Sequence, residues 1–332
     1  MAVPRFRFPS VFAASFAFVL LTLCATQAVA QQVHLEPRAA DTVKNAADKD
    51  QLPLHLAPIR VDVGLVLVPV TVTDSMNRPV MGLNKQDFTL SEGTQSQEIR
   101  YFSAQDSPLS VGILLDVSAS MKDKIELVRD ALTEFLNDSH PDDDYFVVTF
   151  SDRPQIVADV TQSIGTIRAR LAQVTPSGHT ALLDAIYLGV QKLKHARYQR
   201  KALLIISDGG DNHSRFTAGE LKALVMETDV QIYGIGIYSA FFHTPEEWSG
   251  KHLLTEITEA TGGRTITIGN ARQLPQAASD ISTELRNQYM LGYAPKEQPS
   301  SVWRNIKVSI SRRENGLPLH LFWRKGYQDP GQ

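Results

Sequence analysis

The sequence has almost no cysteine and no excess of charge of one sign. Its 332 residues include one cysteine, Cys24, which excludes a disulfide framework, a zinc site built from several cysteines and an iron–sulfur cluster. The 33 basic and 36 acidic residues give a net charge of -3, so no basic excess exists to neutralise a nucleic-acid backbone, and we expect no nucleic-acid partner. The nine histidines include no H-E-x-x-H motif and no pair at metal-ligand spacing.

Long hydrophobic runs are also scarce. The one long uncharged run, residues 11–24, follows Arg5 and Arg7 and precedes Ala28-Val29-Ala30, which offers small residues for a cleavage site. This order predicts a signal peptide over residues 1–30 and an exported protein, periplasmic or secreted. The alternative is an uncleaved N-terminal anchor. No other run approaches about 20 apolar residues, so no membrane span is expected after signal cleavage.

The rest of the chain divides by composition and rhythm. Residues 31–57 are polar and predict a flexible leader. Short β-branched runs predict a β-rich N-terminal flank over 58–108 and a β-rich C-terminal flank over 289–332. We expect the two flanks to form one small accessory β module, with a hairpin turn at 314–316 joining strands at 305–311 and 317–324. The region between the flanks, residues 109–288, is a separate domain in this interpretation.

Strands and helices alternate in the central region. The runs at 111–115 and 202–206 are continuously apolar, which is typical of parallel strands covered on both faces. The pattern therefore predicts an α/β fold with a doubly wound, mostly parallel sheet, whose ligands bind at the carboxyl ends of the strands. The expected strands are 110–116, 145–150, 202–207, 231–238 and 265–268, and the expected helices are 122–137, 164–173, 181–196, 218–228, 251–261 and 274–286.

Oxygen-bearing side chains gather where these strands end and helices begin. Asp116, Ser118 and Ser120 follow the first central strand, Thr180 precedes a helix, and Asp208 follows another apolar strand. In a doubly wound sheet these three turns share one edge. Hydroxyl and carboxylate oxygens are the ligands that hard divalent cations prefer, so we expect Mg²⁺ here, with Mn²⁺ and Ca²⁺ as alternatives.

This pattern resembles the metal-ion-dependent adhesion site of the von Willebrand factor type A domain. The family's D-x-S-x-S falls on Asp116, Ser118 and Ser120, its loop threonine on Thr180 and its later aspartate on Asp208. Over about residues 60–327 the chain also resembles an exported bacterial family of von Willebrand factor A-related proteins known from acidobacteria. One departure is His179, where the family usually has a glycine; we expect this side chain to be exposed or to lie next to the metal without binding it.

The resemblance implies a binding module without catalytic residues. It implies that Ser118, Ser120 and Thr180 hold the cation directly or through water, while Asp116 and Asp208 act mostly through water and hydrogen bonds. It also implies that a Glu or Asp side chain of a partner protein completes the coordination. Nothing in the sequence indicates an oligomeric state.

Two other functions remain as alternatives. The first is a structural envelope scaffold whose metal only stabilises the fold. The second is a magnesium-dependent phosphatase-like hydrolase, which needs a second aspartate two residues after Asp116, where this chain has Ser118. A further acidic run, Asp142-Asp143-Asp144, predicts a solvated turn before a strand and not a second metal site.

Overall fold

The computed structural model describes residues 65–238, 245–295, 303–311 and 318–328, without the side chains of 245–247. All of these residues belong to one unit, Arg60–Gln332. The predicted signal peptide and leader and the turn at 314–316 lie outside the described residues. Within the described ranges, no helix combines the length and the hydropathy that a membrane span requires.

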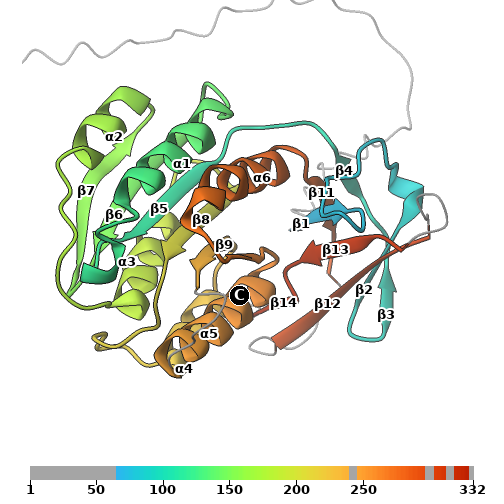
Figure 1. Ribbon diagram of the computed structural model, residues 1–332. Coiled ribbons are helices and arrows are strands. Elements are labelled where there is room, and N and C mark those ends of the chain that lie inside the picture. The colour runs from blue at the N-terminus through green and yellow to red at the C-terminus, as the bar shows by residue number, and fades with distance from the viewer. Residues whose placement is uncertain (1–64, 239–244, 296–302, 312–317, 329–332) are drawn as a thin grey trace, which may run out of the picture. The chain divides into compact units, whose positions relative to one another are not determined.

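A six-stranded sheet forms the centre of the α/β part (Figure 1). Its strand order is β10-β9-β8-β5-β6-β7, and every neighbouring pair is parallel except β6 and the edge strand β7. The predicted α/β fold with a mostly parallel sheet is confirmed, although β7 was not expected. The strands are β5 (Ser110–Asp116), β6 (Asp144–Phe150), β7 (Pro154–Thr161), β8 (Lys201–Ser207), β9 (Val230–Ile237) and β10 (Thr265–Ile268).

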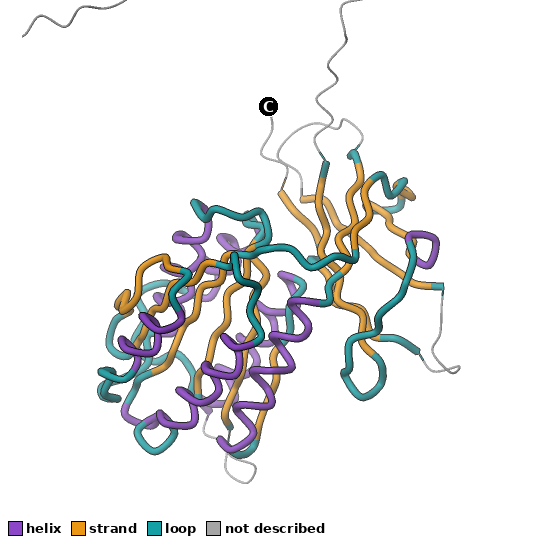
Figure 2. The backbone as a smooth tube through the Cα atoms, turned by 90° about the horizontal axis from the view of Figure 1, so that it is seen from above, coloured by secondary structure: helices purple, strands orange, loops and turns teal. Residues whose placement is uncertain are grey.

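Helices cover both faces of this sheet (Figure 2). Side chains of β5 alternate between the two layers: Ile113 and Leu115 pack with α1, α2 and α6, whereas Leu114 packs with α3, α4 and α5. This alternation explains the continuous apolar run, because every residue of β5 is buried. The helices are α1 (Ile125–Asn137), α2 (Ile164–Leu171), α3 (Leu182–Lys194), α4 (Ala218–Met226), α5 (Pro245–Thr261) and α6 (Leu274–Arg286).

The strands of the two flanks pair with one another. β1 (Val66–Thr73) pairs with β11 (Tyr289–Tyr293), and β2 (Phe88–Glu92) pairs with β12 (Trp303–Ile310), both antiparallel. They form two four-stranded sheets, β13-β1-β11-β4 and β14-β12-β2-β3, and not a single sheet. The sheets share one apolar cluster that includes Val70, Leu90 and Val308. The remaining strands are β3 (Gln95–Gln97), β4 (Tyr101–Ser103), β13 (His320–Trp323) and β14 (Gly326–Gln328).

Two local predictions are wrong. The two strands flanking residues 314–316 do not form a hairpin, because β12 pairs with β2 and β14 while β13 pairs with β1. The acidic run Asp142–Asp144 was predicted to be a solvated turn, but Asp143 is only 1% exposed. Its carboxylate accepts a hydrogen bond from the backbone N–H of Leu109 at 2.9 Å and pairs with Arg286 at 2.7 Å. Asp143 therefore fixes the entry to the central sheet.

Candidate metal centre

The sequence-predicted residues lie at the carboxyl ends of the two middle strands of the sheet. Asp116 ends β5 and Asp208 directly follows β8, and these strands are parallel neighbours with Leu115 opposite Ile206. The chain runs from β5 to β6 on one side, whereas β8 lies on the other side of β5. The site is thus at a topological switch point, where doubly wound folds leave a crevice for ligands.

Asp116 forms the floor of the site. Its side chain is fully buried, and its carboxylate accepts hydrogen bonds from the Ser207 hydroxyl at 2.6 Å and from the Ser118 backbone N–H at 2.9 Å. Burial raises the pKa of Asp116 to about 6, because the loss of hydration outweighs these two hydrogen bonds. A cation above this carboxylate would restore the lost stabilisation of its charge.

Ser118, Ser120 and Asp208 form a chain of hydrogen bonds above this floor. The hydroxyl oxygens of Ser118 and Ser120 are 3.1 Å apart, and the Ser120 hydroxyl donates to Asp208 at 2.8 Å. Ser118 is 2% exposed and Asp208 4% exposed, so both are held in place by their surroundings. Hydrogen bonds therefore connect four of the five predicted residues, Asp116, Ser118, Ser120 and Asp208.

Thr180 reaches the same edge on a third loop. Its backbone N–H donates to the Asn212 side chain at 2.9 Å, and its carbonyl accepts from the N–H groups of Asn212 and His213. The preceding Gly178 carbonyl accepts from Ala119 N–H at 3.1 Å, which ties this loop to the serines. Within the described residues the Thr180 hydroxyl makes no hydrogen bond, and it faces the Asp208–Gly209 turn, where a Cβ on Gly209 would lie 4.0 Å from it.

Two residues of the site were not predicted from the sequence. Ser207 supports Asp116, and Lys124 forms an ion pair with the outer carboxylate oxygen of Asp208. The Lys124 ammonium also donates to the Ser120 carbonyl at 3.2 Å. The available signal for Lys124 was its spacing, since it lies one helical turn after Ser120.

The donor set fits a hard divalent cation. Within the described part of the chain, the side-chain atoms that could coordinate a cation here are hydroxyl and carboxylate oxygens, the ligands typical of Mg²⁺ and Ca²⁺. Of the two carboxylates, that of Asp116 is fully buried and that of Asp208 is paired with Lys124. The site therefore already attracts positive charge at Asp208. Asp116, Ser118, Ser120, Thr180 and Asp208 are the residues that would hold the ion.

Comparison with known proteins places this region in a family. Residues 111–210 match the model of the von Willebrand factor type A domain. Human inter-alpha-trypsin inhibitor heavy chain H4 is 27% identical over 158 residues, which is 43% of this chain but 17% of that protein. The chain thus spans less than a fifth of this relative.

Solved structures with a similar arrangement have low sequence identity. The PilB minor pilin from Streptococcus sanguinis aligns with a TM-score of 0.46 and 15% identity over 55% of this chain and 62% of the pilin. The proximal thread matrix protein 1 from the mussel byssus, with a zinc-occupied MIDAS motif, aligns with a TM-score of 0.47 and 19% identity over 58% of this chain and 49% of that one. From the family match over residues 111–210, we conclude that this chain contains a von Willebrand factor type A domain.

Proposed function

We propose that the protein is exported and binds partner proteins through a divalent cation at the Asp116–Asp208 site. Domains of this family typically mediate protein binding and are usually not catalytic. The observation that carries the proposal is the hydrogen-bonded cluster of carboxylate and hydroxyl side chains, Asp116, Ser118, Ser120 and Asp208, at one edge of the sheet. The export step rests on the signal-peptide pattern of residues 1–30.

The division of labour among the residues follows from their burial. Buried Asp116 is oriented by Ser207 and supplies negative charge beneath the ion, while the hydroxyls of Ser118, Ser120 and Thr180 supply neutral oxygens. Three of the five residues offer neutral oxygens, and the charge of Asp208 is shared with Lys124, so part of the charge of Mg²⁺ stays uncompensated and attracts a carboxylate from outside. The preferred partner group is therefore a glutamate or aspartate side chain.

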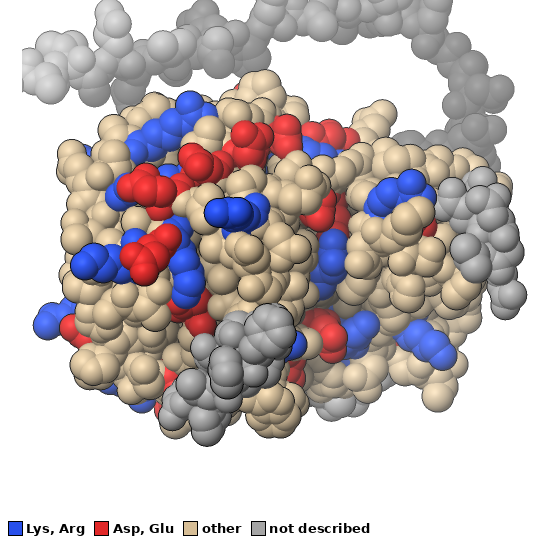
Figure 3. Space-filling model, in the orientation of Figure 1, with Lys and Arg blue, Asp and Glu red and all other residues tan. Residues whose placement is uncertain are grey.

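The face of the protein drawn in Figure 3 offers no basic patch that would attract an acidic partner. On this face several acidic side chains lie in a band across the upper part, and basic side chains are scattered around them. A mixed surface of this kind produces little long-range steering. Selectivity for an acidic partner group on this protein would consequently depend on the local charge of the metal site.

Metal binding is tested by calorimetric titration of the metal-stripped protein with Mg²⁺ and Mn²⁺. We expect one saturable site that Asp116→Ala and Thr180→Ala each weaken by at least about tenfold, since each variant removes one oxygen ligand or its orienting charge. Asp142→Ala and Thr89→Ala, at exposed positions, are the matched controls and should bind as the wild type does. A folded wild-type chain that binds neither ion would contradict the proposal.

The role of a partner carboxylate is tested on the Mn²⁺-loaded protein. Water on bound Mn²⁺ enhances the relaxation of solvent protons, and a carboxylate that replaces this water should reduce the enhancement. We expect glutamate-containing peptides to reduce it and the matching glutamine peptides to leave it unchanged. Metal binding without any response to carboxylates, together with metal-dependent thermal stabilisation, would favour the scaffold alternative.

The raised pKa of Asp116 predicts how metal affinity depends on pH. The ion needs the ionised carboxylate, and with a pKa of about 6 this group is mostly protonated at pH 5 and mostly ionised at pH 7. We therefore expect Mg²⁺ affinity to fall about tenfold between pH 7 and pH 5, since half of the Asp116 carboxylates are already protonated near pH 6. Calorimetry across this range checks it; an affinity that stays constant down to pH 5 would show that Asp116 is not linked to the ion.

A further inference from the structure

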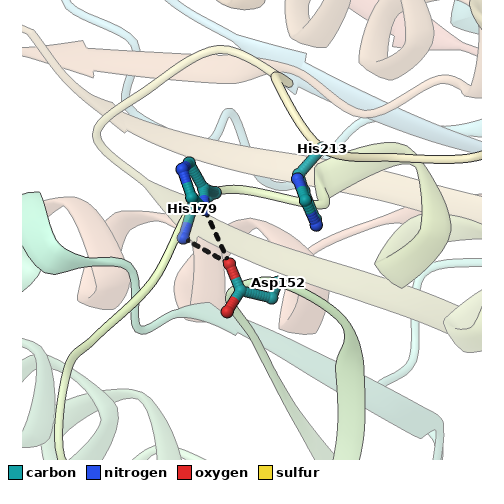
Figure 4. A group of neighbouring side chains, drawn as sticks. All are labelled: Asp152, His179 and His213. Atoms are coloured by element: carbon teal, nitrogen blue, oxygen red, sulfur yellow. Dashed lines mark hydrogen bonds and ion pairs between the residues drawn. The ribbon is translucent and has the colours of Figure 1, made fainter.

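Three metal-binding side chains meet beside the mouth of the cation site. Asp152 follows β6, His179 precedes Thr180, and His213 lies in the loop after Asp208. One ligand atom from each lies within 4.8 Å of the others. Figure 4 shows the two imidazole rings above the Asp152 carboxylate, and the rings stack at 5.0 Å with an angle of 14°.

Backbone contacts hold these side chains in place. Asp152 accepts a hydrogen bond from the His179 backbone N–H at 2.8 Å, and the same oxygen is 2.8 Å from the His179 ring nitrogen Nδ1. Gly178 has a φ of +82°, and a Cβ there would lie 2.8 Å from both Asp152 oxygens. Glycine thus leaves room for the carboxylate to lie against the loop. His213 is tied to the same loop by its N–H bond to the Thr180 carbonyl at 3.1 Å.

The ligand chemistry differs from that of the neighbouring site. Two imidazole nitrogens and one carboxylate oxygen are a ligand set typical of zinc and other late first-row ions, whereas Mg²⁺ prefers oxygens alone. The side chains of His179 and Asp152 are 67% and 53% exposed, so a fourth position would remain open to solvent. Zinc ligands lie about 2.0–2.2 Å from the ion, and the exposure of these side chains leaves them free to rotate toward such distances.

We propose that Asp152, His179 and His213 form a second cation site that binds Zn²⁺-type ions and leaves one position open. The site is separate from the Asp116–Asp208 site in both residues and metal preference, although both use the loop that carries Thr180. An ordinary hydrogen bond between His179 and Asp152 would not need His213, whose ring nitrogens make no hydrogen bond within the described residues. The contribution of His213 therefore separates a metal site from a surface ion pair.

The test is a titration of the full protein with Zn²⁺ in excess Mg²⁺, followed by calorimetry, and with Co²⁺, followed by its visible absorption. We expect one Zn²⁺ per chain and a Co²⁺ spectrum of low coordination number. His179→Ala and His213→Ala should each weaken Zn²⁺ binding by at least about tenfold, since even changes outside the ligand shell cost 10–100-fold. His195→Ala, an exposed histidine after α3, is the matched control and should have no effect.

The same titration in Asp116→Ala distinguishes the two sites. If the inference is right, Zn²⁺ binding persists in Asp116→Ala and is weakened in His213→Ala. Zn²⁺ binding that is lost in Asp116→Ala and unchanged in His213→Ala would place the ion at the oxygen site and overturn the proposal. Absence of Zn²⁺ binding by the folded wild-type chain would overturn it as well. All three side chains are exposed, so the substitutions should leave the fold intact.

Discussion

Replacing Arg304 by methionine is expected to lower the free energy of unfolding by about 3–5 kcal/mol, because it leaves a buried carboxylate without its cation. Arg304 is 6% exposed and its guanidinium lies 3.1 Å from a carboxylate oxygen of Glu92, which is 8% exposed. The other oxygen of Glu92 accepts hydrogen bonds from the hydroxyls of Tyr293 at 2.6 Å and Tyr327 at 3.1 Å. Burial raises the pKa of Tyr293 well above its ordinary value, so its hydroxyl remains a donor.

Denaturant unfolding of the wild type and of Arg304→Met measures this effect. Lys307→Met on the same strand is the matched control, since Lys307 is exposed and should change stability by less than about 0.5 kcal/mol. The double variant Glu92→Gln/Arg304→Met should regain part of the loss, because a neutral amide costs less to bury than an unpaired charge. A loss below about 1 kcal/mol in Arg304→Met would contradict the view that this ion pair stabilises the buried Glu92 carboxylate.

Glu92, Tyr293, Arg304 and Tyr327, here called the Glu92 cluster, also connect the two flanks. The cluster joins residues of β2, β11, β12 and β14, two segments of chain that are separated in sequence by the whole α/β domain. The side-chain nitrogen of Gln288 lies within hydrogen-bond distance of Thr71 in β1, at 3.2 Å, and of Gln231 and Tyr233 in β9, each at 3.0 Å. The α/β part of the chain thus lies in sequence between two flanks whose strands pair with one another, and Gln288 links it to β1 by a hydrogen bond.

The central fold was predictable because its signals are local. Strands β5 and β8 are continuous apolar runs, and a capping box formed by Thr217 and Glu220 marks the start of α4 close to the predicted residue 218. Strand β7 escaped prediction because it is an edge strand that begins at Pro154 and has one buried residue among eight, so it lacks the apolar run of the central strands. The false hairpin at 314–316 has a different cause: alternation of apolar residues tells which face of a strand is buried, but not which strand pairs with it.

Some residues at this edge of the sheet could likewise be predicted from the sequence, and others could not. Asp116, Ser118, Ser120 and Asp208 follow predicted strands directly, so the rule for parallel sheets brings them together. His179 and His213 belong to different loops, and their meeting with Asp152 depends on hydrogen bonds between loops that no spacing rule describes. The absence of a histidine pair at ligand spacing therefore did not exclude a histidine pair in space. The spacing of Lys124 from Ser120 is visible in the sequence, but its ion pair with Asp208 joins two distant segments and was not predicted.

Lys124→Met is expected to raise the affinity for Mg²⁺ by about 10–100-fold. The Lys124 ammonium pairs with Asp208, which is 4% exposed, and donates to the Ser120 carbonyl, so it holds positive charge where the ion would bind. Two unit charges about 4 Å apart interact by roughly 4 kcal/mol at an effective dielectric constant of 20, and repulsion from a divalent ion is larger. Because Lys124 can move toward solvent, we expect only about 1.4–2.8 kcal/mol of this to appear as affinity.

Calorimetry and thermal unfolding, each with and without Mg²⁺, test this role. Lys122→Met is the matched control, because Lys122 is exposed and lies two residues before Lys124. Without metal, Lys124→Met should unfold at a lower temperature than wild type, since buried Asp208 loses its counter-charge; with saturating Mg²⁺ this difference should shrink or reverse. Weaker Mg²⁺ binding in Lys124→Met would instead mean that the lysine orients Asp208 for the ion. The expected result would make Lys124 an internal competitor, so that metal binds only when this ammonium leaves Asp208.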